Sequence, residues 1–328
     1  MLESLREVDT VVFDKTGTLT QEQPTISHIH VLHPTYDETQ VLYAAASAEY
    51  RQPHPVAKAI WEKAMSQSVN PTNPDNIRYE VGYGISVQLD QQTIRVGSAR
   101  FMQREGLTIP PQTDTLQQRA ETHGHSLIYV GINEDVAGVL EMQPSIRPEV
   151  PDLIKTLKQR CITTYIISGD HEQPTRNMAE QLGVDHYFAE TLPENKAELI
   201  NQLREQGKFV CFIGDGINDS IALKSAQVSI SLKGASSAAI DTAQIIFMDG
   251  TLAPLSRLFA FADEFEHTMR NNLLFSIAPG ILNIGGVYLL HFGVAASMGL
   301  FYVGTTAGLT NTVLPLIKHQ NPAKTTDK

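Results

Sequence analysis

Short runs of apolar and β-branched residues that end in acidic or small polar residues constrain the fold of this chain most. They span Thr10–Phe13, Ile162–Ser168, Phe209–Ile213 and Val228–Ile230, and helical patterns at Glu149–Gln159, Pro174–Leu182 and Glu194–Gln206 alternate with the later runs. Strands that alternate with helices predict a parallel sheet with helices on both faces. Ligands of such sheets bind at the carboxyl ends of the strands. We therefore expect three loops to converge there, at Asp14, at Ser168 to Asp170 and at Gly214 to Asp219.

A long segment separates the first of these runs from the others and predicts a second, α+β domain inserted into the first. Its expected elements are helices at Glu38–Tyr50 and Pro55–Ser66 and strands within Ile77–Leu89, Thr93–Val96 and Leu127–Ile132. The expected boundaries place the first domain at residues 1–24 and 134–265 and the insertion at residues 25–133.

The C-terminal region differs sharply from the rest, because no Asp, Glu, Lys or Arg occurs from Asn271 to Ile317. A single membrane helix needs roughly 20 apolar residues, so this stretch is long enough for two, with a break around His291–Gly293. Basic residues at both ends, Arg270 and Lys318, suit a hairpin with both ends in the cytoplasm. A buried helical pair in a soluble domain is the alternative, since small residues serve helix packing in either setting. We expect two transmembrane helices in residues 266–318 and a polar tail at 319–328, and hence a multi-pass protein of the cell membrane with its other domains in the cytoplasm.

Charge and cysteine content exclude several classes of partner. The formal net charge is −11, which argues against a nucleic-acid or anionic-lipid surface because both require clustered Lys and Arg. The two cysteines, Cys161 and Cys211, each lie in an apolar run. A disulfide framework or a cysteine metal site is therefore not expected, and a reducing compartment fits.

The most specific motif is DKTGTLT at Asp14–Thr20, directly after the first expected strand. The motif resembles the phosphorylation site of P-type ATPases, a branch of the haloacid dehalogenase superfamily. The chemistry that this resemblance implies fits the spacing, because a carboxylate at a strand end can attack the γ-phosphoryl group of ATP and become an aspartyl phosphate. The turn around Gly17 can offer backbone N–H groups to the phosphate oxygens. This resemblance implies a haloacid-dehalogenase-like, Rossmann-type α/β fold with an inserted α+β nucleotide-binding domain and a C-terminal transmembrane helical hairpin.

The residue two positions after the nucleophile separates pumps from phosphatases of this fold. Phosphatases place a second Asp there as general acid and base, whereas this chain has Thr16, which cannot shuttle a proton at neutral pH. The acyl phosphate is therefore expected to persist, as a pump requires. A phosphohydrolase with a membrane anchor is the alternative, and a non-catalytic, nucleotide-sensing membrane protein is a third reading.

The resemblance extends to the loops expected beside Asp14. Ser168, Gly169 and Asp170 match the family's TGD motif with Ser in place of Thr, and either hydroxyl can hold a phosphate oxygen. Lys196, in the sequence Pro-Glu-Asn-Lys, matches the lysine that contacts the transferring phosphoryl group as a point charge.

The sequence GDGIND at Gly214–Asp219 matches the family's magnesium motif. The resemblance implies that Asp215, Asp14 and the carbonyl of Thr16 bind Mg²⁺, a hard cation that prefers oxygen ligands. Asn218 and Asp219 are expected to order the shell around it.

A further resemblance, to the His-Pro motif of heavy-metal-transporting P-type ATPases, lies in the expected insertion at Ala48–Ile60. It implies an ATP site in which His54 contacts the adenine and Glu49 is its acidic partner. Gly82 and Gly84 match the subgroup's paired glycines, where a missing Cβ lets ATP approach the backbone. Gly97 matches another glycine, although Ser98 follows it where Asn is usual.

The resemblance covers residues 3 to 320 and corresponds to the C-terminal portion of a heavy-metal pump. The subgroup's upstream membrane helices with their Cys-Pro motif, and the actuator domain with its TGE loop, have no counterpart in this sequence. We therefore expect either a fragment or a split pump whose other half is a separate chain, able to phosphorylate itself but poor at turnover alone.

The residues expected to contact the transported ion are Asn283 in the first membrane segment and Met298 in the second, with Thr305 or Thr310 beside it. Zinc pumps usually carry Lys and Asp in these helices, and this chain has neither there. The pattern favours copper, and another transition metal remains open.

Overall fold

The structure is a computed structural model that describes residues 2–80, 83–215, 219–233 and 237–320. The chain divides into two compact units. One unit is Val8–Ala253, and the other joins Met1–Glu7 to Pro254–Lys328. Each unit is described by itself below.

The first sheet of the larger unit is parallel and has the strand order β12-β11-β10-β1-β8-β9. Its strands are β1 (Thr10–Asp14), β8 (Thr163–Ile167), β9 (His186–Phe188), β10 (Val210–Ile213), β11 (Val228–Leu232) and β12 (Ile245–Phe247). Every residue of β1 is buried, as expected for a central strand covered on both faces. The predicted parallel sheet and its four predicted strands are confirmed.

The helices of this sheet follow its strands along the chain. They are α6 (Val150–Gln159), α7 (Glu172–Leu182), α8 (Pro193–Glu205), α9 (Ser220–Ser225) and α10 (Ser237–Thr242). A proline lies in the first turn of both α6 and α8, where its missing N–H costs no helical hydrogen bond. Gly183 ends α7 in the left-handed conformation, which glycine adopts without a steric penalty.

The second sheet is antiparallel, with the order β2-β7-β6-β5-β4-β3. Its strands are β2 (Thr25–Val31), β3 (Asp75–Glu80), β4 (Gly84–Leu89), β5 (Gln92–Gly97), β6 (Ser126–Ile132) and β7 (Asp135–Gln143). Helices α2 (Glu38–Ala48) and α3 (Pro55–Ser66) pack on one face, and α4 (Ala99–Arg104) packs on the other together with Leu107. Helix α5 (Gln112–His123) contacts β6.

The boundary of the second sheet differs from the one expected from the sequence. The expected insertion ended at residue 133, but β7 pairs with both β2 and β6 and carries this sheet to Gln143. The sequence signal was weak because β7 is buried along most of its length and does not alternate between apolar and polar residues.

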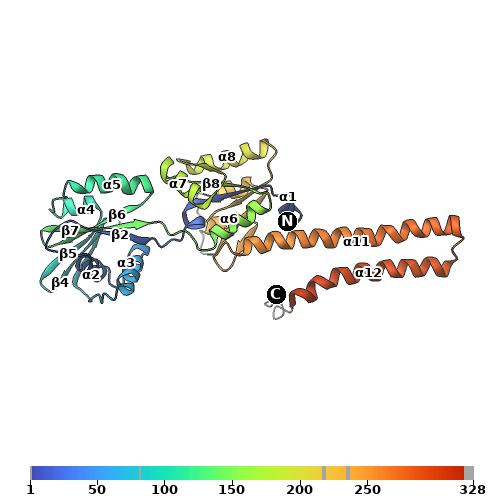
Figure 1. Ribbon diagram of the computed structural model, residues 1–328, viewed down its shortest axis with the longest axis horizontal. Coiled ribbons are helices and arrows are strands. Elements are labelled where there is room, and N and C mark those ends of the chain that lie inside the picture. Colours follow the sequence, from blue (N-terminus) through green and yellow to red (C-terminus); the bar gives the residue numbers. More distant parts are fainter. Residues whose placement is uncertain (1, 81–82, 216–218, 234–236, 321–328) are drawn as a thin grey trace. The chain divides into compact units, whose positions relative to one another are not determined.

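The smaller unit contains α1 (Leu2–Glu7) and two long helices, α11 (Pro254–Leu290) and α12 (Val294–Gln320), which run side by side in opposite directions (Figure 1). The predicted break is confirmed between Leu290 and Val294. Gly304 permits close packing, because a Cβ there would overlap Pro279 and the carbonyl of Phe275 on α11. Small residues at such contacts are typical of membrane helix pairs.

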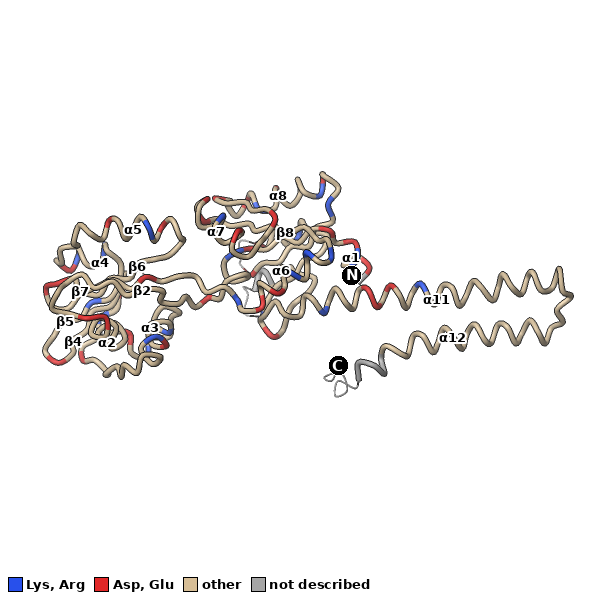
Figure 2. Tube along the Cα trace, in the orientation of Figure 1, with Lys and Arg blue, Asp and Glu red and all other residues tan. Residues whose placement is uncertain are grey.

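Charged residues are confined to one end of the helical hairpin. Figure 2 shows Lys, Arg, Asp and Glu on the first turns of α11 and none along its remainder or along the described part of α12 before Lys318. Within the described residues, α11 is the helix that is long and apolar enough to cross a membrane, judged by length and composition alone. The expectation of a second span in α12 stays a prediction.

Candidate active site

Strand β1 lies where the order of the parallel sheet reverses direction. It pairs with β10 on one side and with β8 on the other, and such a switch point is where ligands bind in open α/β sheets. Asp14 ends β1, Ser168 follows β8, and Asp215 follows β10 by two residues. The predicted convergence of the three loops at one sheet edge is thus confirmed.

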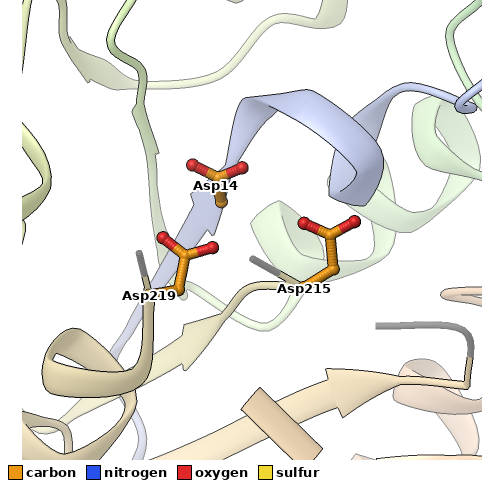
Figure 3. A group of neighbouring side chains, drawn as sticks. All are labelled: Asp14, Asp215 and Asp219. Atoms are coloured by element: carbon orange, nitrogen blue, oxygen red, sulfur yellow. The ribbon is translucent and has the colours of Figure 1, made fainter. Parts of the chain in front are cut away.

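Three carboxylates meet at this edge (Figure 3). The ligand oxygens of Asp14, Asp215 and Asp219 all lie within 4.8 Å of one another. Asp14 and Asp219 are buried. Burial, followed by the charge of Asp219, raises the pKa of Asp14 to about 7, although Lys196 acts in the opposite direction. The same two causes raise the pKa of Asp215 to about 6.

Lys196 places one positive charge among these carboxylates. Its Nζ lies 2.5 Å from Asp14 Oδ1 and 2.7 Å from Asp219 Oδ1. Burial alone would lower the pKa of Lys196, but the charges of Asp14 and Asp219 outweigh it and raise this pKa. The lysine therefore stays charged and holds Asp14 from the α8 side of the site.

The loop after Asp14, Lys15–Leu19, turns back toward Asp215. Gly17 has a left-handed backbone with φ of 76°, and a Cβ on it would overlap the Asp215 carboxylate. Arg147 donates one hydrogen bond to the carbonyl of Gly17 at 2.8 Å and another to that of Gly250 at 2.9 Å. Glycine is thus required at this position both by conformation and by space, and Arg147 fixes the loop from outside the motif.

The Ser168 loop contributes a second lysine–aspartate contact. Ser168 is buried and its Oγ accepts a hydrogen bond from the Asp170 backbone N–H at 3.0 Å. Asp170 also contacts the ammonium group of the buried Lys15. Burial lowers the pKa of Lys15, against the opposing effect of Asp14. The sequence alone does not indicate the roles of Lys15 and Arg147, because their partners Asp170 and Gly17 are distant in the sequence.

The acidic group fits a hard divalent cation. Three carboxylates face one ammonium group, and burial makes their full ionisation unfavourable without more positive charge. Carboxylate oxygens are the ligands that Mg²⁺ prefers. Of the other predicted ligands, the Thr16 side chain is exposed, Gly169 is exposed beside Ser168, and Asn218 lies outside the described residues.

The connection between α2 and α3 places His54 and Glu49 together, as the sequence predicted. His54 caps the N-terminus of α3, since its Nδ1 accepts a hydrogen bond from Ala57 N–H at 3.2 Å. Its Nε2 lies 3.0 Å from Glu49 Oε2, and its ring stacks on Tyr79 with centroids 6.2 Å apart. Glu49 is buried, and burial raises its pKa despite the opposing effect of His54.

The glycines of this domain are explained by packing within the chain. Gly84 and Gly97 are paired in register between β4 and β5. A Cβ on Gly84 would overlap Phe101, and one on Gly97 would overlap the carbonyl of Tyr83. Gly82, the other predicted glycine, lies outside the described residues. Ser98 caps α4 by accepting a hydrogen bond from Phe101 N–H at 3.2 Å.

Of the residues predicted to contact a transported ion, some line a common cavity and others do not. Asn283 and Thr305 line the same cavity between α11 and α12, and within the described part of the chain Asn283 Oδ1 has no hydrogen-bond partner. Met298 is 52% exposed and does not line that cavity, and neither does Thr310.

Comparison with known families identifies the family to which the larger unit is similar. A haloacid dehalogenase-like hydrolase model matches residues 8–227. A copper-exporting P-type ATPase of Vibrio cholerae is 33% identical over 300 residues, which are 90% of this chain and 32% of that protein. A zinc-transporting ATPase of Bacillus subtilis is 32% identical over 305 residues, which are 91% of this chain and 47% of that protein. The chain thus spans 32% to 47% of the length of these relatives.

Solved structures agree with this placement. The crystal structure of a zinc-transporting PIB-type ATPase superposes with a TM-score of 0.83 at 27% identity, over 94% of this chain and 50% of that one. The catalytic domain of the CPx-ATPase CopB-B, for which conformational changes upon nucleotide binding are described, gives a TM-score of 0.58 at 27% identity over 79% of this chain and 92% of that one. The chain therefore belongs to the haloacid dehalogenase-like hydrolases and is homologous to the C-terminal catalytic portion of heavy-metal P-type ATPases.

Proposed function

We propose that this chain transfers the γ-phosphoryl group of ATP to Asp14 and uses the resulting aspartyl phosphate to drive transport of a transition-metal cation. The contact that carries the proposal is the one between Lys196 and Asp14 at the switch point of the parallel sheet, beside two further carboxylates.

The reaction follows from the groups at this edge. An Asp14 carboxylate oxygen attacks the γ-phosphorus while the bond from that phosphorus to the bridging oxygen of ADP breaks. Lys196 lies against Asp14 and offers a positive charge to the entering phosphoryl oxygens. The Ser168 hydroxyl and the backbone of Gly169 stand at the end of the neighbouring strand, where they can hold a phosphoryl oxygen.

Asp14, Asp215 and the carbonyl of Thr16 would hold Mg²⁺, with Asp219 beside them. Bound there, the cation would neutralise charge that builds up on the phosphate during transfer. The raised pKa values of Asp14 and Asp215 support a requirement for this cation, because they reflect an excess of buried negative charge. Asn218 completes the proposed shell by its position in the motif.

ATP is proposed to bind at the second sheet. The His54 ring, held by its cap and by Glu49, presents a flat surface next to Tyr79 on which an adenine can stack. Gly82, Gly84 and Gly97 belong to the same proposed site, and the tight packing of the last two shapes the backbone of the β4–β5 hairpin.

Transport is proposed to involve α11 and α12 as two membrane spans, with residues 1–253 in the cytoplasm. Asn283 and Thr305 in the shared cavity are the proposed ion contacts, and Met298 is a weaker candidate because it lies outside it. Copper and zinc are the ions named for the relatives, and the lack of Lys and Asp from Asn271 to Ile317 favours copper.

A phosphohydrolase with a membrane anchor is the competing function. It would need a general acid and base two residues after Asp14, and Thr16 cannot fill that role at neutral pH.

The proposal is tested by metal-dependent ATP hydrolysis of the full chain in lipid vesicles. We expect slow, Mg²⁺-dependent hydrolysis that responds to Cu⁺ or Zn²⁺ and disappears in Asp14→Asn. Asp9→Asn is the matched control, since Asp9 lies at the opposite end of β1 and accepts a hydrogen bond from Phe209 N–H. Hydrolysis that survives in Asp14→Asn would overturn the assignment.

A further inference from the structure

Arg147 lies where the chain returns from β7 to the parallel sheet, and its side chain bridges two loops. Its Nη2 donates a hydrogen bond to the carbonyl of Gly17 at 2.8 Å, and its Nη1 donates another to the carbonyl of Gly250 at 2.9 Å. Gly17 belongs to Lys15–Leu19, which we name the phosphorylation loop. Gly250 belongs to residues 248–253, which join β12 to α11 and which we name the pre-α11 turn. One guanidinium group thus connects the phosphorylation loop to the segment from which α11 begins.

The backbone of Arg147 is also fixed beside the phosphorylation loop. Its N–H donates a hydrogen bond to the carbonyl of Leu19, the last residue of that loop, at 3.0 Å. Next to this contact, Thr20 and Ile146 form an isolated antiparallel bridge. Because both the backbone and the side chain of Arg147 contact the loop, a displacement of the loop is passed on to this residue.

Glu149 holds the pre-α11 turn at a second point. Its Oε1 accepts a hydrogen bond from the Leu252 N–H at 3.0 Å, and Leu252 is fully buried. Pro254, the first residue of α11, follows the turn directly. The turn is therefore held by two side chains of one short segment, and a movement of Arg147 reaches the start of α11 along the chain.

An arginine suits this bridge better than a lysine does. Its guanidinium group holds several N–H donors in a rigid, planar fork, whereas lysine offers one compact ammonium group on a flexible stem. Hydrogen bonds from a charged donor are about twice as strong as those between neutral groups. The charge also reaches Asp215, because Arg147 acts to lower the pKa of that carboxyl against the burial that raises it. A lysine at position 147 would keep the charge and lose the bridge, so the two contributions can be separated.

We propose that Arg147 is a positioning residue that couples the state of Asp14 to the pre-α11 turn and hence to α11. A phosphoryl group on Asp14 accepts hydrogen bonds from N–H groups of the phosphorylation loop, and the resulting shift of the Gly17 carbonyl passes through the guanidinium group to Gly250. Such coupling is reciprocal, so a change at the turn also alters the loop. The inference rests on the proposed function, because phosphorylation of Asp14 is the event that Arg147 transmits.

The test is hydrogen–deuterium exchange of the full chain in lipid nanodiscs, with and without Mg²⁺ and beryllium fluoride, which binds to a carboxylate as a phosphoryl analogue. In the wild type we expect exchange to slow in peptides of residues 15–20 and of residues 248–253. In Arg147→Lys, the response of residues 15–20 should remain and that of residues 248–253 should be lost, because lysine cannot hold both carbonyl groups at once.

The matched control is Arg204→Lys. Arg204 also donates a hydrogen bond to a backbone carbonyl, that of Ser225 at 2.7 Å, but this contact joins α8 to α9. The control should therefore keep both responses. If Arg147 only stabilised the fold or only supplied charge, the folded Arg147→Lys variant would keep the response of residues 248–253, and that result would overturn the proposal.

A second measurement needs no phosphoryl analogue and separates this inference from the proposed function. Glu149→Ala releases the Leu252 N–H, and reciprocal coupling then predicts faster exchange in residues 15–20. This increase should disappear when Arg147→Lys is combined with Glu149→Ala.

The two measurements distinguish the possible failures. A wild-type chain whose residues 15–20 do not respond to Mg²⁺ and beryllium fluoride would contradict phosphorylation of Asp14, and the Glu149→Ala comparison would then decide the coupling alone. Circular dichroism reports whether each variant is folded, and Glu149→Ala by itself decides if Arg147→Lys does not fold. Exchange in residues 15–20 that is unchanged by Glu149→Ala, or increased equally with arginine and lysine at position 147, would overturn the coupling.

Discussion

The two sheets of the larger unit place their proposed functional groups in different ways. At the parallel sheet, buried charges stand on loops after the strands, and Asp14, Lys196 and Asp219 balance one another. At the antiparallel sheet, His54 also caps a helix, and Gly84 and Gly97 also permit close backbone packing. We therefore expect substitutions at the first site to act on the protein mainly through charge, whereas those at the second should affect structure and binding together.

The largest expected effect tests the charge balance at the parallel sheet. Lys196→Ala leaves buried carboxylates without their ammonium partner, and breaking a buried pair in this way costs about 3–5 kcal/mol. We expect a fall of that size in the free energy of unfolding, measured by chemical denaturation without Mg²⁺ and followed by circular dichroism. Phosphorylation of the variant should also be lost.

The control for that prediction is Lys158→Ala. Lys158 lies 3.2 Å from Asp185, and both side chains are partly exposed, so the loss should be below about 1 kcal/mol. Similar losses in the free energy of unfolding for the two lysine variants would contradict the expected difference between buried and exposed charges.

Gly17→Ala should give the next largest effect. It combines an unfavourable backbone conformation, about 1–2 kcal/mol, with overlap against Asp215, which adds about 1–3 kcal/mol. Gly207→Ala is the matched control, because Gly207 has φ of 82° and open space around it. Thermal unfolding of both variants separates the two causes, and equal shifts of the midpoint would show that Gly17 is needed for conformation alone.

His54 allows capping and ATP binding to be separated. His54→Ala should destabilise α3 by about 1 kcal/mol through loss of the cap. His54→Asn should restore the cap, since Asn is a favoured N-cap residue. Both variants should bind ATP about tenfold more weakly, as expected for one lost contact, in equilibrium titrations. Normal ATP affinity in the folded His54→Asn variant would refute an adenine contact.

The smallest effect on stability is expected for Asp185, which directly precedes β9 of the same parallel sheet. It shows what an ordinary, partly exposed carboxylate contributes. Burial acts to raise its pKa, but hydrogen bonds from Thr164 and Lys158 outweigh burial and lower it. A lowered folded-state pKa stabilises the protein above the unfolded-state value, which is 3.8 for the unperturbed group, and this stabilisation is lost as the pH falls through the folded-state pKa.

Asp185→Asn should therefore cost about 1 kcal/mol at pH 7, and the difference from wild type should shrink as the pH falls below 3.8. Denaturation curves at several pH values measure it. A difference that grows on acidification would have the wrong sign for this account.

The sequence predicted the parallel sheet and the meeting of Asp14, Lys196, Asp215 and Asp219, because these residues stand in specific motifs and strand ends share one sheet edge. The pair His54–Glu49 was also predicted. Tertiary contacts between distant segments were not, among them Arg147 with Gly17, Lys15 with Asp170 and His30 with Glu141. Packing also gave Gly84 and Gly97 a role that a motif could not indicate.

The boundary of the insertion was missed for a related reason. The nearly continuous burial of β7 gives no alternating pattern, and its pairing with β2 joins residues more than a hundred positions apart. Residue type favours Met298 as an ion contact, but the cavity between α11 and α12 is lined by a mixture of polar residues, glycines and apolar residues that a helical pattern alone does not single out.

The central claim is the covalent aspartyl phosphate at Asp14. The most direct measurement is labelling of the full chain with γ-phosphate-tagged ATP and Mg²⁺, followed by acid quench, hydroxylamine treatment and mapping of the labelled peptide. The account predicts an acid-stable label that hydroxylamine releases, that maps to the peptide containing Asp14 and that is absent in Asp14→Asn. A label that persists in Asp14→Asn, or no label from a folded chain that binds ATP, would contradict it.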